Sequence, residues 1–373
     1  MRLFECQACG QALYFENTLC ESCGHRLGYL PEQAEMSALE PEGEVWRPLA
    51  DVENTYRFCA NVEYASCNWL VPADSDSIFC LACRHNRVIP NLGDERSLIF
   101  WRRIEVAKHR LIYSLLRFKL PLVTKAIDPG GLAFDFLDAS VVPVMTGHLN
   151  GVITINLAEA NDAHREEQRG AMGEPYRTLL GHFRHEIAHY YWDRIVRDHP
   201  VVDGFRSIFG DERQDYGEAL RRHYAEGPPA DWPQRFVTSY ASAHPWEDFA
   251  ETWAHYLHIV DTLETASAFG VKIKPRVAQG SELAASVDFD PYRAGIDRLI
   301  AAWLPLTFAF NSINRSMGLS DLYPFVLSPT IIMKLSFIHD QVHRRTSDAE
   351  TNDEAALKAM AEGLRKAVAA PGQ

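Results

Sequence analysis

The feature that most constrains this sequence is a short motif, His-Glu-x-x-His, formed by His185, Glu186 and His189. Residues four apart lie on one face of a helix, so both imidazoles can reach a single zinc ion. A helix is favoured because no Gly or Pro occurs from residue 183 to 198 and apolar residues recur every four positions. Glu186 lies further round the helix, where it can reach a water on the metal. The motif predicts a zinc hydrolase, provided that a third ligand comes from elsewhere.

A second charged helix is predicted downstream, and it offers that ligand. Pro245 suits a first helical turn, and Glu247, Glu251 and His255 are four residues apart on one face. We expect Glu247 to be the third zinc ligand. Glu251 would accept a hydrogen bond from a zinc-ligating histidine and fix its tautomer. The alternatives are Asp248 as the ligand, an exchange of roles between the two glutamates, and an ordinary solvated face.

All eight cysteines precede position 84, which indicates metal binding in one region of the chain. Four thiolates suit a closed tetrahedral zinc site that folds a module too small to have its own core. The first set consists of two Cys-x-x-Cys pairs, each followed by Gly, and the second set contains one such pair. We therefore expect two structural zinc ions, one bound by Cys6, Cys9, Cys20 and Cys23 and one by Cys59, Cys67, Cys80 and Cys83. Unligated thiols and cross-pairing between the sets are the alternatives.

The order of these features predicts an α+β protein in five segments. They are a zinc ribbon (1–30), a Pro-containing acidic linker with little structure (31–54), a second four-cysteine zinc module (55–92), a mostly helical zincin-like domain with a small sheet (93–345) and a charged, Ala-rich tail (346–373). In the zincin-like domain, helices are expected over residues 94–119, 292–318 and 328–345. Pro305 should kink or divide the second of these.

Strand candidates precede the motif, at residues 132–137, 141–145 and 148–157. Asn150-Gly151 indicates a hairpin turn. We expect residues 152–157 to form an edge strand that pairs with an extended peptide, with an ordinary interior strand as the alternative.

Charge and hydropathy limit the classes of partner. A net charge of -13 argues against a dedicated nucleic-acid binder. The basic stretch over residues 84–125 could bind an acidic partner or a nucleic acid, but a solvated face or pairing within the chain is favoured. The N-terminus lacks an apolar core of signal-peptide length, and no apolar run is long enough to span a bilayer. We expect a cytoplasmic protein that acts on a peptide or protein, does not bind membranes, and has zinc ribbons available to a protein partner.

Two resemblances support a peptidase. The motif with a glutamate on a later helix is the gluzincin arrangement, and Tyr240, Glu247, Ala250 and Glu251 form a Tyr-x6-Glu-x-x-Ala-Glu pattern similar to that of anthrax lethal factor type peptidases. That resemblance implies that Tyr240 donates a hydrogen bond to the oxyanion. The whole layout resembles bacterial zinc-binding metallopeptidases with an N-terminal zinc ribbon. It implies cleavage of a peptide or isopeptide bond by zinc-activated water, with Glu186 as the general base.

Two competing hypotheses remain. The chain could be a catalytically inactive adaptor whose zinc ribbons bind a partner, or a nucleic-acid-binding protein. Metal content separates an enzyme from an adaptor, because the enzyme needs one catalytic zinc ion besides the two structural ions. A steep salt dependence of binding would indicate a nucleic acid.

Overall fold

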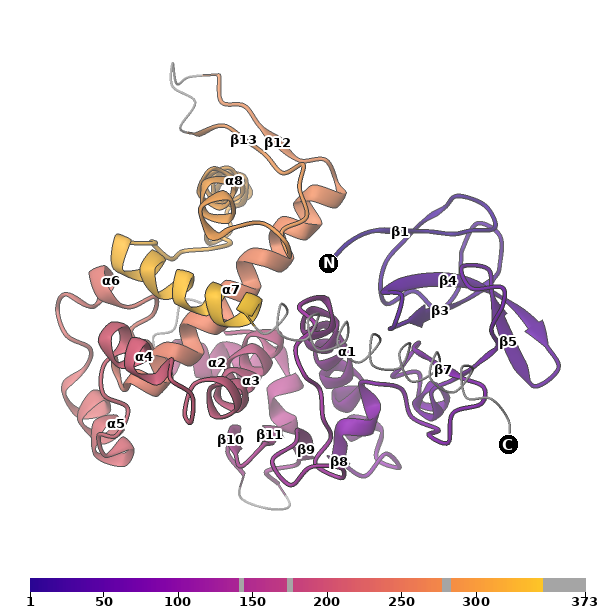
Figure 1. Cartoon of the computed structure of the whole chain (residues 1–373), viewed down its shortest axis with the longest axis horizontal. Coiled ribbons are helices and arrows are strands. Elements are labelled where there is room, and N and C mark those ends of the chain that lie inside the picture. Colours follow the sequence, from indigo (N-terminus) through magenta and orange to yellow (C-terminus); the bar gives the residue numbers. More distant parts are fainter. Residues whose placement is uncertain (141–143, 173–176, 277–282, 345–373) are drawn as a thin grey trace, which may run out of the picture.

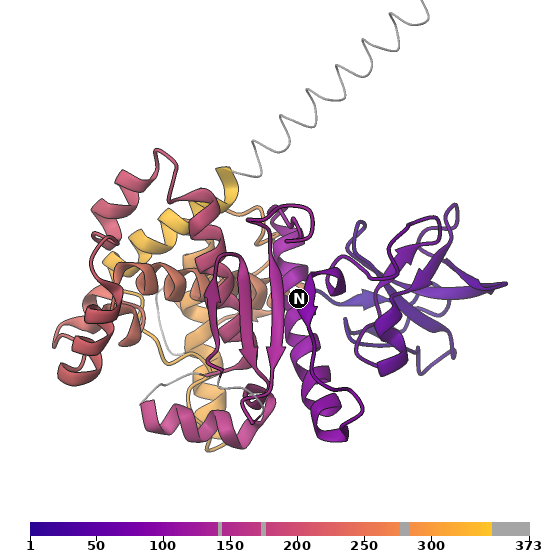
Figure 2. The same cartoon turned by 90° about the horizontal axis from the view of Figure 1, so that it is seen from below.

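A computed structural model describes residues 1–140, 144–172, 177–276 and 283–344. It shows a β-rich N-terminal part beside a larger, mostly helical part with a small sheet at its lower edge in Figure 1 and in front of the helices in Figure 2. The mixed α+β class predicted from the sequence is confirmed. Within the described residues, no helix is long and apolar enough to cross a bilayer.

The N-terminal part is built on two antiparallel sheets. The strands β1 (Phe4–Glu5) and β2 (Ala12–Leu13) form a small hairpin. A five-stranded sheet follows in sequence order, made of β3 (Arg26–Leu30), β4 (Glu35–Glu42), β5 (Val45–Pro48), β6 (Tyr56–Phe58) and β7 (Leu70–Pro72). A parallel bridge between Tyr29 and Trp69 brings the last strand back to the first. The 3-10 helix η1 (Ala60–Tyr64) follows Cys59, and the 3-10 helix η2 (Cys83–His85) begins with Cys83, the last cysteine of the second set.

The prediction of an unstructured linker over residues 31–54 is wrong, because β4 and β5 lie within it. Met36 and Ala38 on β4 are fully buried, so this segment contributes to the core of the sheet. Proline has no backbone N–H to donate to a neighbouring strand, and two of the prolines that suggested a linker occupy positions where such a donor is not required. Pro41 lies beyond the part of β4 that pairs with β3, and Pro48 is the last residue of β5.

The sheet of the larger part has the order β10-β11-β9-β8. Its strands are β8 (Asn86–Val88), β9 (Ala133–Leu137), β10 (Gly147–Leu149) and β11 (Val152–Asn156). The hairpin turn is confirmed, since Asn150 and Gly151 both have positive φ. The edge-strand prediction is wrong, because β11 lies between β9 and β10, and the short β10 forms the edge. Part of the strand candidate at 141–145 lies outside the described residues, as does the tail over 346–373.

Helices pack around this sheet (Figure 1). Helix α1 (Glu95–Arg117) begins at the N-cap Asp94, close to its predicted limits. The next elements are η3 (Leu157–Ala160), α2 (Asp162–Met172), α3 (Leu179–Ile195), α4 (Val202–Phe209), α5 (Tyr216–Glu226), α6 (Trp232–Arg235), η4 (Tyr240–Ser242) and α7 (Pro245–Ala268). The strands β12 (Lys272–Ile273) and β13 (Ala285–Ser286), helix α8 (Ile296–Ser316) and a helix over 329–344 complete the described chain. Helix α8 continues through Pro305, so this proline does not divide it.

The core of the larger part fixes α3 against both α7 and the sheet. Tyr191 of α3 stacks on Trp253 of α7 with ring centroids 5.3 Å apart. Phe183 of α3 contacts Phe134 and Phe136 of β9 edge-on, at 5.7 and 6.4 Å. Aromatic pairs of this kind are favourable beyond the area that they bury. The two helices that carry the motif and the later glutamates are therefore held in one rigid arrangement.

Candidate zinc centre

Helix α3 carries the His-Glu-x-x-His motif, as its apolar periodicity predicted. Thr178 caps the helix, since its hydroxyl accepts a hydrogen bond from the backbone N–H of Gly181. The apolar residues Phe183, Ile187 and Tyr191 are fully buried. With that face of α3 packed in the core, His185 and Glu186 line a cavity of about 430 Å³.

His185, His189 and Glu247 converge at one point between α3 and α7. Their donor atoms all lie within 4.8 Å of one another. Nε2 of His185 is 3.2 Å from Nε2 of His189, and these nitrogens lie 2.9 and 3.6 Å from Oε2 of Glu247. Although burial favours a neutral carboxyl, the two histidines hold the pKa of Glu247 well below its usual value.

This donor set fits a zinc ion. Two imidazoles and one carboxylate are the ligands of many catalytic zinc sites, and they leave a position open for water. Oε2 of Glu247 is buried and accepts no hydrogen bond within the described residues. A buried carboxylate oxygen without a donor is costly unless a cation satisfies it.

Glu251 lies on the other side of His185. Nδ1 of His185 donates to Oε1 of Glu251 at 2.7 Å, and Oε2 of Glu251 accepts from the Thr238 hydroxyl, also at 2.7 Å. The proton on Nδ1 leaves the lone pair of Nε2 directed toward Glu247 and His189. Asp248, considered as an alternative ligand, instead forms a buried ion pair with Lys334 at 2.6 Å and does not join the donor set.

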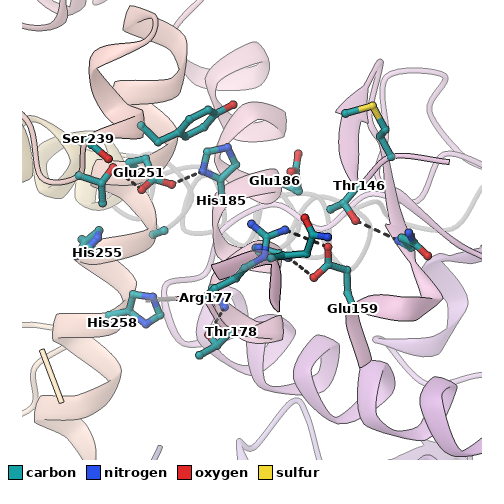
Figure 3. Close-up of a pocket in the computed structure, with 18 of the residues that line it drawn as sticks. Thr146, Glu159, Arg177, Thr178, His185, Glu186, Ser239, Glu251, His255 and His258 are labelled. Carbon is teal, nitrogen blue, oxygen red and sulfur yellow. Dashed lines mark hydrogen bonds and ion pairs between the residues drawn. The ribbon is translucent and has the colours of Figure 1, made fainter. Parts of the chain in front are cut away.

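Many polar and charged side chains line the cavity beside the donors (Figure 3). His185, Glu186, Glu251 and Tyr240 line it near the donor set. Its lining also includes Glu159 of η3, Arg177 just before α3, His182 of α3, and His255 and His258 of α7. The carboxylate of Glu186 therefore faces the space that a substrate bound at the donor set would occupy.

The cysteines form two separate clusters, each with four sulfurs within 4.8 Å of one another. In the first, Cys6 is 3.6 Å from Cys23, and Cys9 is 3.6 Å from Cys20. In the second, Cys67 is 3.7 Å from Cys80, and all four cysteines are buried. Each cluster contains only the set that the sequence spacing suggested, which fits a closed tetrahedral zinc site.

Comparison with known proteins identifies the family. A family model described as a "putative zinc-binding metallo-peptidase" matches residues 97–341, which is more than half of the chain. The chain belongs to this metallopeptidase family. A zinc-ribbon domain model matches residues 3–94 and thus spans both cysteine clusters. Zinc binding at the family level agrees with the donor set and with the two clusters.

Curated relatives of this chain come from mycobacteria. Uncharacterized proteins of Mycobacterium bovis and of two strains of Mycobacterium tuberculosis are each 44% identical over 355 residues. The alignments cover 94% of this chain and 98% of each relative. No solved structure gives a significant match.

Two tyrosines lie near the donor set of His185, His189 and Glu247. Tyr240, suggested by the lethal-factor resemblance, has its ring centroid 6.0 Å from that of His185. Burial and the nearby Glu247 raise the pKa of Tyr240, so its phenol stays protonated. Tyr216 was not suggested by the sequence. Its hydroxyl donates to Oε1 of Glu247 at 2.7 Å, which leaves Oε2 as the oxygen that faces the histidines. No local spacing connects Tyr216 with Glu247, because it lies on α5.

His109 of α1 is a second residue that the sequence did not reveal. Its Nε2 lies 3.3 Å from Sγ of Cys67 and 3.6 Å from Sγ of Cys83, while Nδ1 donates to the carbonyl of Glu105 at 2.6 Å. Lys108 and Glu105 form a fully buried ion pair next to the same sulfurs. Since α1 lies within the metallopeptidase match, these contacts fasten the second cysteine cluster to that domain.

Proposed function

We propose that this protein is a zinc-dependent metallopeptidase, with a zincin-like site, that hydrolyses a peptide or isopeptide bond of a polypeptide. The observation that carries the proposal is the convergence of His185, His189 and Glu247 at a cavity that Glu186 also lines. These three residues would hold the catalytic zinc ion. Bound zinc supplies a Lewis acid that polarises the scissile carbonyl and lowers the pKa of water.

The protein's own groups account for the remaining steps. Glu186 accepts the proton from water and delivers it to the nitrogen of the departing amine. The protonated phenol of Tyr240 donates a hydrogen bond to the carbonyl oxygen as negative charge develops there. Glu251 and Thr238 hold His185 in one tautomer and orientation. Tyr216 holds the second oxygen of Glu247.

The basic residues of α1 support this proposal over nucleic-acid binding. Arg103, Arg110 and Arg117 form ion pairs with carboxylates elsewhere in the chain. Lys108 is fully buried against Glu105. These side chains are engaged within the protein and do not form an open cationic face.

The deciding experiment compares cleavage products and metal content together. The purified protein would be tested in three states: as isolated, after mild chelation, and after zinc has been added back. Each sample would be incubated with a cell extract, and new N-termini would be identified by mass spectrometry. We expect new N-termini that disappear on chelation and return with zinc. Their absence from a zinc-loaded sample would contradict the proposal and favour the adaptor hypothesis.

Metal analysis should find three zinc ions per chain, two in the cysteine clusters and one in the open site. The open site has an exchangeable position and should release its ion to a mild chelator first. A Glu247→Ala variant should contain two ions, because it loses one of three ligands at that site. Mass spectrometry under native conditions checks both statements. Three ions in the Glu247→Ala variant would show that this residue is not a ligand.

The two tyrosines should have separable effects. Tyr240→Phe should lower kcat by about 10²- to 10³-fold with zinc affinity unchanged, as expected for loss of an oxyanion donor. Tyr216→Phe should weaken zinc affinity by about 10- to 100-fold, because it releases the oxygen of a metal ligand. Kinetics with quenched peptides and zinc competition titrations measure these effects. Tyr224→Phe, a change at another tyrosine that lines the cavity, is the matched control. Identical effects of the first two substitutions would contradict the assigned roles.

A further inference from the structure

A carboxylate–imidazole pair lines the cavity close to the proposed general base. His182 lies four residues before Glu186 on α3, so both side chains occur on the same side of the helix. Nδ1 of His182 is 3.3 Å from Oε2 of Glu159, which is in η3. Neither residue belongs to the metal donor set or to the contacts that hold it.

The surroundings of Glu159 keep its carboxyl group ionised. Its side chain is only 6% exposed, yet Arg177 reaches its other oxygen, with Nη2 at 3.2 Å from Oε1. Burial alone would raise the pKa of Glu159, but His182 and Arg177 lower it to about 2. A buried, ionised carboxylate with two fixed partners is a strong constraint on the orientation of both.

The ring of His182 therefore presents a defined atom to the cavity. Nδ1 is buried 3.3 Å from Oε2 of Glu159, in ion-pair contact but without a hydrogen bond of normal geometry. His182 is 18% exposed at its side chain and lines the cavity. A neutral imidazole with its proton on Nδ1, the nitrogen that faces Glu159, carries a lone pair on Nε2.

We propose that His182, held by Glu159, binds the substrate by accepting a hydrogen bond from an N–H group of the polypeptide beside Glu186. This inference rests on the proposed peptidase function and adds a binding residue to it. An extended polypeptide offers backbone N–H groups in this position, and a fixed acceptor orients the chain without contributing to the chemical step.

Kinetics with a pool of quenched peptides would test the proposal on zinc-loaded protein. His182→Ala should raise KM by about three- to tenfold, the effect of one lost hydrogen bond, with kcat and zinc content little changed. Glu159→Gln should raise KM less. His164→Ala changes another imidazole of the cavity and should leave KM unaltered. An unchanged KM in His182→Ala would overturn the proposal and leave the peptidase function standing.

A readout without turnover separates this inference from the function on which it rests. Nuclear magnetic resonance of protein with ¹⁵N-labelled histidine reports which ring nitrogen of His182 is protonated. We expect the Nδ1–H tautomer in the wild type and its loss in Glu159→Gln. An Nε2–H tautomer in the wild type would overturn the inference. Failure of the zinc-loaded wild type to cleave any peptide would instead contradict the proposed function.

Discussion

Replacing Glu186 with Gln is expected to abolish hydrolysis while the fold and the zinc content stay unchanged. The side chain lines the cavity and is absent from the metal donor set, so an amide of the same shape should be tolerated. An amide cannot accept the proton from water, and loss of a general base costs about 10²- to 10⁴-fold in rate. Rates on a quenched peptide pool, zinc analysis and thermal unfolding measure the three quantities.

The matched control for this prediction is Glu251→Gln, which also changes a cavity carboxylate to an amide. Glu251 contacts His185 and Thr238, so this variant should lose zinc affinity and retain turnover when zinc is in excess. The two substitutions should therefore differ in their response to added zinc. If the Glu186→Gln variant cleaves at the wild-type rate, Glu186 is not the general base. If added zinc restores its activity, Glu186 acts by helping to bind zinc.

The parts of this molecule that the sequence predicted depend on short-range patterns. The motif on α3, the glutamates on α7 and the paired cysteines are each set by spacings of a few residues, which helices and knuckle turns convert directly into geometry. The hairpin at Asn150-Gly151 is equally local. For these features, residue type and spacing suffice because no distant segment has to be placed.

The errors and omissions have the opposite cause. β11 is an interior strand because it pairs with both β10 and β9. The residues of β11 alone do not indicate whether it has one neighbouring strand or two. The acidic segment over 31–54 becomes ordered because β4 pairs with β3 and buries Met36 and Ala38 in the hydrophobic core. Tyr216 and His109 reach their partners through tertiary packing, across 31 residues in the first case and 42 in the second. A single sequence contains no spacing rule for such contacts.

A Cys83→Ser substitution is expected to destabilise the metallopeptidase domain as well as the zinc ribbon. Sγ of Cys83 lies 3.6 Å from both Glu105 and His109 of α1, in a fully buried cluster. Lys108 on the same helix lies over the rings of Phe134 and Phe136, and these rings contact Phe183 of α3. Structural zinc contributes on the order of 10 kcal/mol to small metal-dependent folds. Losing a few kcal/mol should lower the unfolding temperature by about 6–12 °C.

The first cluster provides the control, because Cys9 and Cys23 are exposed and none of its sulfurs contacts α1 in the described residues. Cys9→Ser should therefore release one zinc ion with a small change in the unfolding temperature and in peptidase activity. His109→Ala keeps all the thiolates, so it should fold and show an intermediate loss of stability. Hydrogen exchange would place that loss in α1 if the cluster fastens this helix. Equal effects of Cys83→Ser and Cys9→Ser, with exchange in α1 unchanged, would show that the second cluster stabilises the ribbon alone.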